Sequence, residues 1–225
     1  YNAKEKKDGF DIIFCTLHGG GKFSDKNYKT SSGLHGVGAA CVNAFAEWLN
    51  ITVYKDGKEV QGGYRDGGKK KIAPKVIGNT SKRGSIVSFK PKLGILTDVT
   101  WRYELFAEHL NNTASQLPGV HVYLIDERTD RKDDFYYENG IKEYLERKNQ
   151  NNKALTPILH FKETVGGNTI EFAFQYLDQF YEERFYSFAN TVFTPDEGTH
   201  VRGFRIGFNK AINEYGKKIK EKLGV

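Results

Sequence analysis

Residues 33–45 read Gly-Leu-His-Gly-Val-Gly-Ala-Ala-Cys-Val-Asn-Ala-Phe, and this stretch decides the fold. Its three glycines stop where apolar residues begin to recur at helical spacing, so the pattern predicts a helix over about 37–49. The glycine-rich segment before it, residues 18–38, has little apolar surface to bury, and we expect a long mobile loop there. A helix that begins at such a loop presents unpaired backbone N–H groups and a partial positive charge.

Such a junction is suited to binding a phosphate, because glycines let the backbone approach an anion without a Cβ clash. Two familiar phosphate motifs do not match. The P-loop requires Ser or Thr after Gly-Lys, whereas Phe23 follows Gly21-Lys22. The dinucleotide fingerprint runs Gly-x-Gly-x-x-Gly after a strand, whereas residues 33–38 run Gly-x-x-Gly-x-Gly after a polar loop. The pattern leaves polyphosphate binding as a hypothesis, with a flexible surface loop as its alternative.

Around the junction the sequence alternates between strand and helix signals. Residues 11–17 predict a short buried helix or strand. Strands are expected at 51–54 with a return strand after the turn pair Asp56-Gly57, at 85–89, at 120–125 and at 169–176, the last with an antiparallel neighbour at 184–192. Helices are expected around 101–110, at 141–145 and over 201–219, and 126–134 fits a hairpin turn. Strands and helices sharing one sheet predict an α/β sandwich, with a second domain beginning near residue 140.

Composition narrows the class of protein. The chain has 225 residues, is 38% hydrophobic and has no apolar run of membrane-spanning length, which favours a soluble folded protein and excludes a membrane protein. Cys15 and Cys41 have no metal-binding spacing, so we expect buried, reduced thiols and a cytoplasmic setting. The sequence has no Met and begins with Tyr1, which favours an excised piece of a larger protein.

The charge is basic, with 34 Lys and Arg against 28 Asp and Glu, a formal net charge of +6. That balance suits a protein working near nucleic acid or nucleotide phosphates. Lysine clusters such as residues 69–71 more often lie on solvent-exposed faces without a binding role, and we expect the same of this cluster.

Several motifs together resemble those of the B subunits of bacterial type II DNA topoisomerases. The resemblance begins in the ATP lid, through Leu17-His18-Gly19-Gly20-Gly21-Lys22-Phe23 and the run from Tyr28 to Gly38, and continues into Val42-Asn43-Ala44-Phe45. It resumes at Tyr136-Tyr137-Glu138-Asn139-Gly140-Ile141, Ala173-Phe174-Gln175-Tyr176 and Gly198-Thr199-His200-Val201-Arg202-Gly203-Phe204. It spans nearly the whole chain in the family's order, and residues 47–49 and 174–176 look closer to topoisomerase IV than to gyrase.

The resemblance implies an ATP-operated, magnesium-dependent clamp that closes by pairing two B subunits around DNA and works with the topoisomerase A subunit. It implies a GHKL-type ATPase α/β sandwich, N-terminally incomplete, over residues 1–139, and part of a ribosomal-protein-S5-like transducer domain over 140–225. The matching nucleotide-binding residues are Lys22 and Tyr28 in the lid, Gly33, Leu34, His35, Gly36, Val37 and Gly38 in the phosphate loop, and Ser85 beneath the adenine. In this interpretation His35 packs the loop and is neither an acid nor a base.

The departures from the family are also informative. No stretch matches the family's general-base Glu, its magnesium-holding Asn or its adenine-reading Asp, so the resemblance implies that this chain alone does not hydrolyse ATP and carries no catalytic or metal-binding residue of its own. Ala39-Ala40-Cys41 replaces a more hydroxyl-rich run, and Glu197 stands where the family usually has glycine. Gyrase B, another GHKL ATPase and a non-catalytic basic DNA-binding module remain as alternatives.

Overall fold

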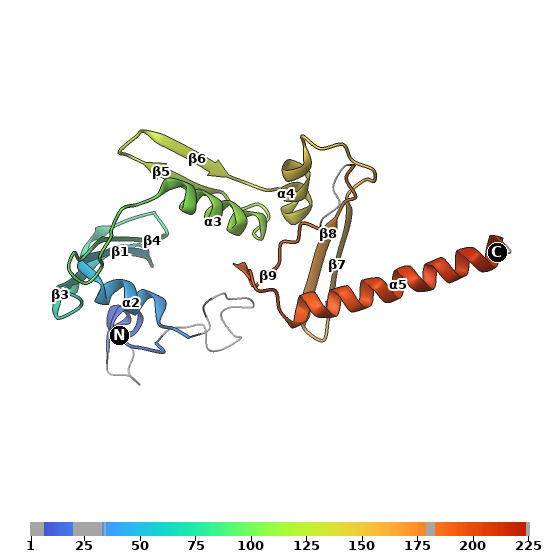
Figure 1. Ribbon diagram of the computed structural model, residues 1–225. Helices are drawn as coiled ribbons and strands as arrows, with labels where there is room; N and C mark the ends of the chain where they lie inside the picture. Colours follow the sequence, from blue (N-terminus) through green and yellow to red (C-terminus); the bar gives the residue numbers. More distant parts are fainter. Residues whose placement is uncertain (1–6, 20–32, 34, 179–182, 224–225) are drawn as a thin grey trace. The chain divides into compact units, whose positions relative to one another are not determined.

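The computed structural model describes residues 7–19, 33, 35–178 and 183–223. The chain forms two compact units, Tyr1–Trp101 (unit 1) and Arg102–Val225 (unit 2). Unit 1 contains α1 (Gly9–Phe14), α2 (Gly38–Ala44), β1 (Ala46–Lys55), β2 (Lys58–Arg65), β3 (Lys70–Asn79) and β4 (Gly84–Pro91) (Figure 1).

Unit 1 is built on one antiparallel sheet in the order β3-β2-β1-β4. The predicted turn pair Asp56 and Gly57, with φ of 53° and 73°, joins β1 to β2 and confirms the hairpin. Helices α1 and α2 cover one face of this sheet, which we call the helix face. The buried residues there are Phe14, Ala46, Leu49, Ile51 and Tyr64, with Phe10, Ala39 and Val53 packed against them. The predicted mixed α/β architecture is confirmed.

The predicted helix over 37–49 is wrong in its second half. The helix ends at Ala44, and the chain enters β1 at Ala46. A bulge in the pairing of β1 with β4, between Ala46 and Trp48, turns Ala46 and Leu49 to the same buried face. The bulge therefore produces a three-residue apolar spacing that imitates a helical period within a strand.

Unit 2 is assembled from hairpins and helices. Its elements are α3 (Tyr103–Ser115), β5 (Val122–Asp126), β6 (Arg131–Phe135), α4 (Gly140–Asn149), β7 (Leu159–Val165), β8 (Asn168–Phe174), β9 (Phe188–Ala189), β10 (Val192–Phe193) and α5 (Thr199–Leu223). Tyr144 of α4 donates a hydrogen bond to Asn112 of α3 at 2.8 Å, so α3 and α4 belong to one packed group. Trp101, expected within the α3 helix, lies just before it.

The antiparallel neighbour expected at 184–192 for the strand over 169–176 is wrong. The strand β8 pairs with β7 across a turn in which Gly166 and Gly167 have φ of 58° and 83°, while β9 pairs with β10. The strand β7 was missed although Leu159, Phe161 and Val165 fall on alternate positions, a period-two pattern that only Glu163 interrupts. The amphipathic helix predicted at 201–219 is confirmed as α5.

Glu197 precedes α5 with φ of 60°, in the left-handed region that favours glycine. For a residue with a Cβ this conformation costs about 1–2 kcal/mol. Its carboxylate Oε1 accepts a 2.8 Å hydrogen bond from Arg205 Nη2, and Arg205 Nη1 donates to Glu183 at 2.6 Å. The Arg205 guanidinium also lies over the Phe185 ring, 4.9 Å from its centroid. These contacts tie the start of α5 to the segment around residue 183.

Leu49 is fully buried at the centre of the helix face, so its truncation should destabilise unit 1. We expect Leu49→Ala to lower the free energy of unfolding by about 2–5 kcal/mol, through lost burial and the cavity left behind. Both tryptophans, Trp48 and Trp101, belong to unit 1, so urea unfolding followed by tryptophan fluorescence reports on this unit. Leu93→Ala is the control, since Leu93 is 68% exposed and should change the free energy by less than about 0.5 kcal/mol. Equal effects of the two variants would contradict the assigned core.

Candidate functional site

The junction between loop and helix forms the centre of the candidate site. Gly36 has φ of 61°, a left-handed turn that glycine adopts without steric cost, and α2 begins at Gly38 with Val37 as its N-cap. The N-cap provides no side-chain hydrogen bond, and the first helical bond runs from Cys41 N to Val37 O at 2.9 Å. The backbone N–H groups of the first helical turn are therefore left to point out of the helix end.

Space is also available at this helix end. A Cβ built on Gly38 would meet no heavy atom within 4 Å, whereas one on Gly19 would lie 2.2 Å from the carbonyl oxygen of Ile12. An open approach to unpaired N–H groups at a helix N-terminus is what an anionic phosphate needs. The described residues of the junction thus fit the phosphate end of a nucleotide.

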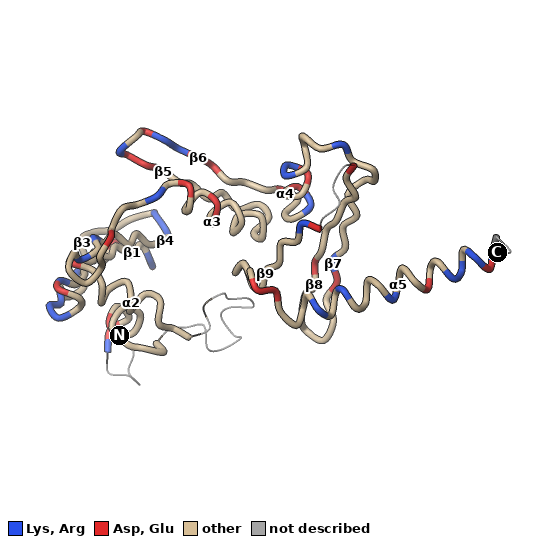
Figure 2. The backbone as a smooth tube through the Cα atoms, in the orientation of Figure 1, with Lys and Arg blue, Asp and Glu red and all other residues tan. Residues whose placement is uncertain are grey.

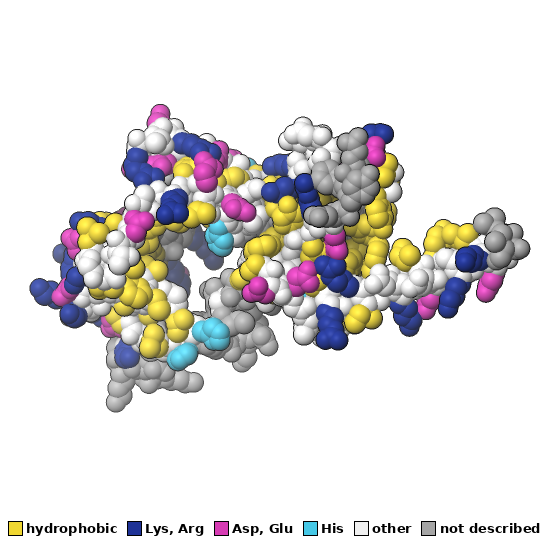
Figure 3. Space-filling view, viewed as in Figure 1, with side chains coloured by type: hydrophobic (Ala, Val, Ile, Leu, Met, Phe, Trp, Pro, Cys, Tyr) yellow, Lys and Arg dark blue, Asp and Glu magenta, His cyan; other side chains and the backbone are white. Residues whose placement is uncertain are grey.

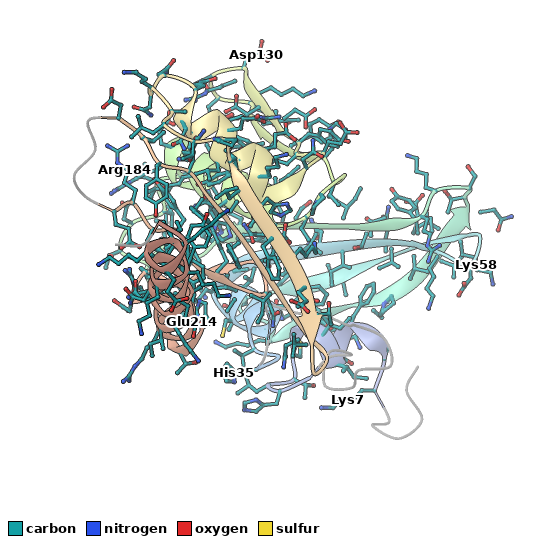
Figure 4. The ribbon with its side chains drawn as sticks, turned by 90° about the vertical axis from the view of Figure 1, so that its right-hand side faces the viewer. Lys7, His35, Lys58, Asp130, Arg184 and Glu214 are labelled. Carbon is teal, nitrogen blue, oxygen red and sulfur yellow. The ribbon has the colours of Figure 1, made fainter. Side chains whose placement is uncertain are left out.

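A contact from His18 lies next to this junction. His18 Nδ1 lies 2.9 Å from the carbonyl oxygen of His35, so this ring nitrogen donates a hydrogen bond to the backbone. The contact joins the segment after α1 to the segment before α2 across 17 residues of sequence. The His35 side chain itself is exposed (Figure 4).

Asn43, which the sequence analysis did not single out as functional, anchors α2 to α1. It is 2% exposed, and its Nδ2 donates to the carbonyl oxygen of Phe14 at 2.9 Å. This bond satisfies the end of α1 and sets where the chain leaves α1 towards the loop. Asn43 is the one amide side chain in an otherwise apolar helix, and this feature of the sequence could have indicated a buried anchoring residue.

An acidic clamp holds α1 on the sheet. Asp8 is the N-cap of α1, and its Oδ1 accepts from the backbone N–H of Phe10 at 2.9 Å and of Asp11 at 3.1 Å. Lys71 of β3 forms ion pairs with both Asp8 and Asp11, and the Tyr64 hydroxyl donates to Asp11 Oδ1 at 2.8 Å. This clamp was not predicted, because Lys71 lies 60 residues from Asp11.

The charge pairing changes the titration of the clamp. Partial burial acts to raise the pKa of Asp8, but the Lys71 ammonium and the backbone hydrogen bonds outweigh it and lower that pKa. Burial likewise acts to lower the pKa of Lys71, but Asp11 and Asp8 raise it overall. Burial, reinforced by hydrogen bonding to Asp11, raises the pKa of Tyr64.

Ser85, the residue matching the adenine side of the site, lies near the start of β4. It is opposite Val53 in the antiparallel pairing, and opposite residues share a face. Because Val53 packs in the core under the helices, Ser85 belongs to the helix face of the sheet. The structure therefore places Ser85 on the same face as α2, and its hydroxyl-bearing side chain is exposed.

Part of the predicted site lies outside the described residues, namely Lys22, Tyr28 and Leu34. Gly33, His35, Gly36, Val37 and Gly38 are described and lead directly into α2. The predicted burial of Cys15 and Cys41 is wrong, since both are free and exposed. Each lies beside a pocket at α2 rather than within the core. The Cys15 thiol is nevertheless partly covered by its neighbours, and this partial burial raises its pKa.

Two pockets flank α2. One, of about 340 Å³, is lined by Phe14, Cys15, Leu17, Ala40, Asn43, Ala44 and residues 67–69. The other, of about 230 Å³, is apolar and lies between α2 and the end of β4, lined by Cys41, Val42, Phe45, Phe89, Pro91, Leu96 and Trp101. Hydrophobic side chains gather over this part of unit 1 (Figure 3).

No group of three or more His, Cys, Asp or Glu side chains that could hold a metal ion occurs among the described residues. Within the same residues, no helix combines the length and the apolar character needed to cross a bilayer.

Comparison with known proteins identifies the fold. Residues 140–223 match the family described as DNA gyrase B. The chain is 40% identical to the B subunit of DNA topoisomerase 4 from Bacillus subtilis over 209 residues, which are 93% of this chain and 32% of that protein. It is 40% identical to the DNA gyrase B subunit of Thermotoga maritima over 226 residues, 96% of this chain and 35% of that protein. The chain spans about a third of the length of these curated relatives.

A solved structure agrees with the sequence relatives. The 43K ATPase domain of Thermus thermophilus gyrase B, crystallised with an aminocoumarin, superimposes with a TM-score of 0.78 at 25% identity, covering 96% of this chain and 55% of that one. The fold is that of the ATPase region of type II topoisomerases. The chain belongs to the family of topoisomerase IV and gyrase B subunits. The family resemblance seen in the sequence motifs is confirmed.

The Asp8–Lys71 pair should make unit 1 sensitive to acid. Because the folded-state pKa of Asp8 is lowered, its contribution to stability is present above the unfolded pKa near 3.9 and is lost as pH falls through the folded pKa. We expect the urea midpoint of Lys71→Met to fall less between pH 7 and pH 3 than that of the unaltered chain, as followed by tryptophan fluorescence.

Lys70→Met is the matched control for this measurement. Lys70 is the exposed neighbour on the same strand, and it forms no ion pair within the described parts of the chain. Its midpoint should show the same pH dependence as that of the unaltered chain. A Lys71→Met chain that loses stability in acid as steeply as the control would refute the clamp.

Proposed function

We propose that this chain binds ATP at the junction before α2 and forms the nucleotide-operated clamp region of a type II DNA topoisomerase B subunit. The observation that carries the proposal is the left-handed Gly36 followed by an uncapped, open helix end at Gly38. Identity of 40% to topoisomerase IV and gyrase B subunits over most of the chain supports it.

The roles of the residues follow from their positions. ATP supplies a triphosphate whose cleavage drives the conformational cycle of the clamp. The N–H groups of the first turn of α2 bind the phosphates and orient them, and the Ser85 hydroxyl binds at the adenine end. Lys22 and Tyr28 complete the site from the lid, and His35, whose side chain is exposed, contributes its backbone carbonyl to the contact with His18. Mg²⁺ would be bound chiefly by the phosphates, because the described residues offer no cluster of their own.

At the level of the whole protein, we propose an ATP-dependent isomerase that passes one DNA duplex through another in the cytoplasm. Two B subunits pair on ATP binding, and the A subunit supplies the DNA break. Topoisomerase IV is preferred, because the motifs at 47–49 and 174–176 favour it, with gyrase B as the alternative. A boundary between an ATPase domain over 1–139 and a transducer domain over 140–225 remains our proposal, supported by the family match that starts at residue 140.

The phosphate cradle can be tested with a single methyl group. Gly38→Ala should leave the fold unchanged, because its Cβ meets nothing in the chain, but that Cβ should obstruct the approach of a phosphate. We expect the Kd for a non-hydrolysable ATP analogue, measured by calorimetry, to rise about tenfold, equivalent to about 1.4 kcal/mol.

Gly78→Ala provides the control for this test. Gly78 lies in β3, and a Cβ there also meets no atom within 4 Å. Both variants should keep the urea midpoint of the unaltered chain, and Gly78→Ala should keep its Kd as well. Identical affinities for the two variants would contradict phosphate binding at α2.

The 225-residue chain should not turn over ATP by itself. No stretch of it matches the family's general-base motif, and a phosphate cradle without a group to orient and deprotonate water is insufficient. We expect phosphate release, measured with malachite green and excess ATP, to stay at the level of a buffer blank. Turnover comparable to that of an intact B subunit would show that another residue of this chain acts as the base.

A further inference from the structure

The segment from β3 to β4, the two edge strands of the sheet, carries an unusual concentration of positive charge. Residues 67–97 contain no Asp or Glu, and their eight basic residues are Lys69, Lys70, Lys71, Lys75, Lys82, Arg83, Lys90 and Lys92. Figure 2 shows Lys and Arg gathering along β3 and the turn that leads into it. The net charge of +6 for the whole chain is therefore distributed unevenly, because this segment alone carries more positive charge than the total.

The strand pairing assigns most of these cations to one surface. Opposite residues share a face, so the register gives the composition of the sheet face that does not carry α1 and α2, which we call the open face. One row across the four strands consists of Lys90, Trp48, Arg65 and Lys70. Three of the four side chains in this row are cationic.

The remaining rows of the open face are mainly polar or glycine, with one lysine, one tyrosine and two exposed isoleucines. They consist of Ser88, Asn50, Gly63 and Ile72, then Ile86, Thr52, Gln61 and Lys75, then Gly84, Tyr54, Glu59 and Gly78. Lys82 lies over the Tyr54 ring at 5.6 Å, next to the last row. Glu59 is the single carboxylate in these four rows, and it accepts a hydrogen bond from Gln61 at 2.7 Å.

These cations have few carboxylate partners within unit 1. Lys71, on the helix face, forms ion pairs with Asp8 and Asp11. Lys69 and Lys92 form ion pairs with Asp66. On the open face Lys90 pairs with Glu47 at 2.9 Å, with both side chains about half exposed. Lys70 and Lys75 are exposed and form no ion pair among the described residues. Their charge is available to an outside anion.

We propose that the open face of the β1–β4 sheet is a docking surface for the phosphate backbone of duplex DNA. With a strand spacing of about 4.8 Å and a rise of about 3.4 Å per residue, the four rows cover about 14 by 20 Å. Cations stand at both ends of that area, and amide and hydroxyl side chains lie between them, which suits sequence-independent contacts to phosphates. The choice of DNA among polyanions rests on the proposed function.

The side chains favour a duplex over a single strand. Single-strand platforms stack successive bases on exposed aromatic rings. On this face the two aromatic residues, Trp48 and Tyr54, are half-buried, six residues apart, and Tyr54 is covered by Lys82. An anionic membrane would instead favour exposed aromatic or aliphatic side chains beside the cations. This face carries two such side chains, Ile72 and Ile86, among its charged and polar groups, so the vesicle arm of the test below separates a membrane from DNA.

The test measures binding of a fluorescein-labelled 30-base-pair duplex by anisotropy over a salt series. In the triple variant K70Q/K75Q/K90Q we expect affinity at 50 mM salt to fall at least tenfold. The slope of log K against log salt should become less steep by up to about 2.7, since each lost phosphate contact removes about 0.9. K70R/K75R/K90R should keep the original affinity and slope.

The matched control removes the same charge from α5, as K217Q/K218Q/K220Q, where all three lysines are exposed. Its DNA affinity should stay within about twofold of that of the unaltered chain. Equal losses in both triple variants would show that net charge alone matters and would overturn the proposal, as would unchanged binding by K70Q/K75Q/K90Q. Unchanged urea midpoints exclude unfolding as the cause.

Two further arms keep the outcomes separate. Vesicles of phosphatidylserine and phosphatidylcholine replace DNA in the first arm, and a loss of vesicle binding without a loss of DNA binding overturns the proposal in favour of a membrane. Affinity for the non-hydrolysable ATP analogue is measured in the second arm and should be the same in all variants. Failure of nucleotide binding there, with the DNA effect intact, counts against the proposed function and leaves the docking surface standing.

Discussion

Unit 1 depends on the burial of Leu49, Ile51 and Tyr64 beneath α1 and α2. These side chains lie on one face of a single antiparallel sheet, and the two short helices are held there by packing together with the bond from Asn43 to Phe14 and the ion pairs of Lys71. Helices of six and seven residues are not stable alone, so their geometry is set by the sheet. The direction in which the helix end at Gly38 points is a consequence of that burial.

The same constraint separates two chemistries. On the helix face an open helix end and a hydroxyl, Gly38 and Ser85, offer a small and directional site for phosphate and base. On the other face the alternation of the strands leaves a broad surface of polar, cationic and a few aliphatic side chains, and its cations carry no directional requirement. One sheet can thus bind the phosphates of a nucleotide through backbone N–H groups on one face and DNA through side-chain charge on the other. The two ligands do not compete for residues.

Features that depend on local chemistry could be predicted from the sequence. The turn at Asp56-Gly57, the strand that became β4 and the long helix α5 follow from turn residues and periodicity, and they are confirmed. The helix after the glycine junction was predicted too long, because a bulge gave Ala46 and Leu49 a helical spacing inside a strand. The partner of β8 was misassigned because the alternation of β7 and the turn pair Gly166-Gly167 were overlooked. Residues that act at a distance, such as Lys71 on Asp8, leave no local signal.

The candidate site likewise combines features set by the local sequence with features set by tertiary packing. The glycines and the start of α2 could be predicted, because a loop that becomes a helix at Gly38 has a recognisable composition. The exposure of Cys15 and Cys41 could not, because it depends on which face of α1 and α2 meets the sheet. The anchoring role of Asn43 also depends on tertiary packing, since its partner Phe14 is 29 residues away in the sequence.

At the entrance to α5, Glu197 occupies a backbone conformation that glycine would adopt freely, and its carboxylate holds Arg205. Glycine at this position would relieve the backbone but release one of the two carboxylates that grip the guanidinium. The two positions should therefore be energetically coupled: with glycine at 197 the arginine at 205 has one carboxylate partner fewer, and without the arginine the glutamate keeps its backbone strain but holds no tether. Such epistasis makes the order of substitutions matter along any path between the two states.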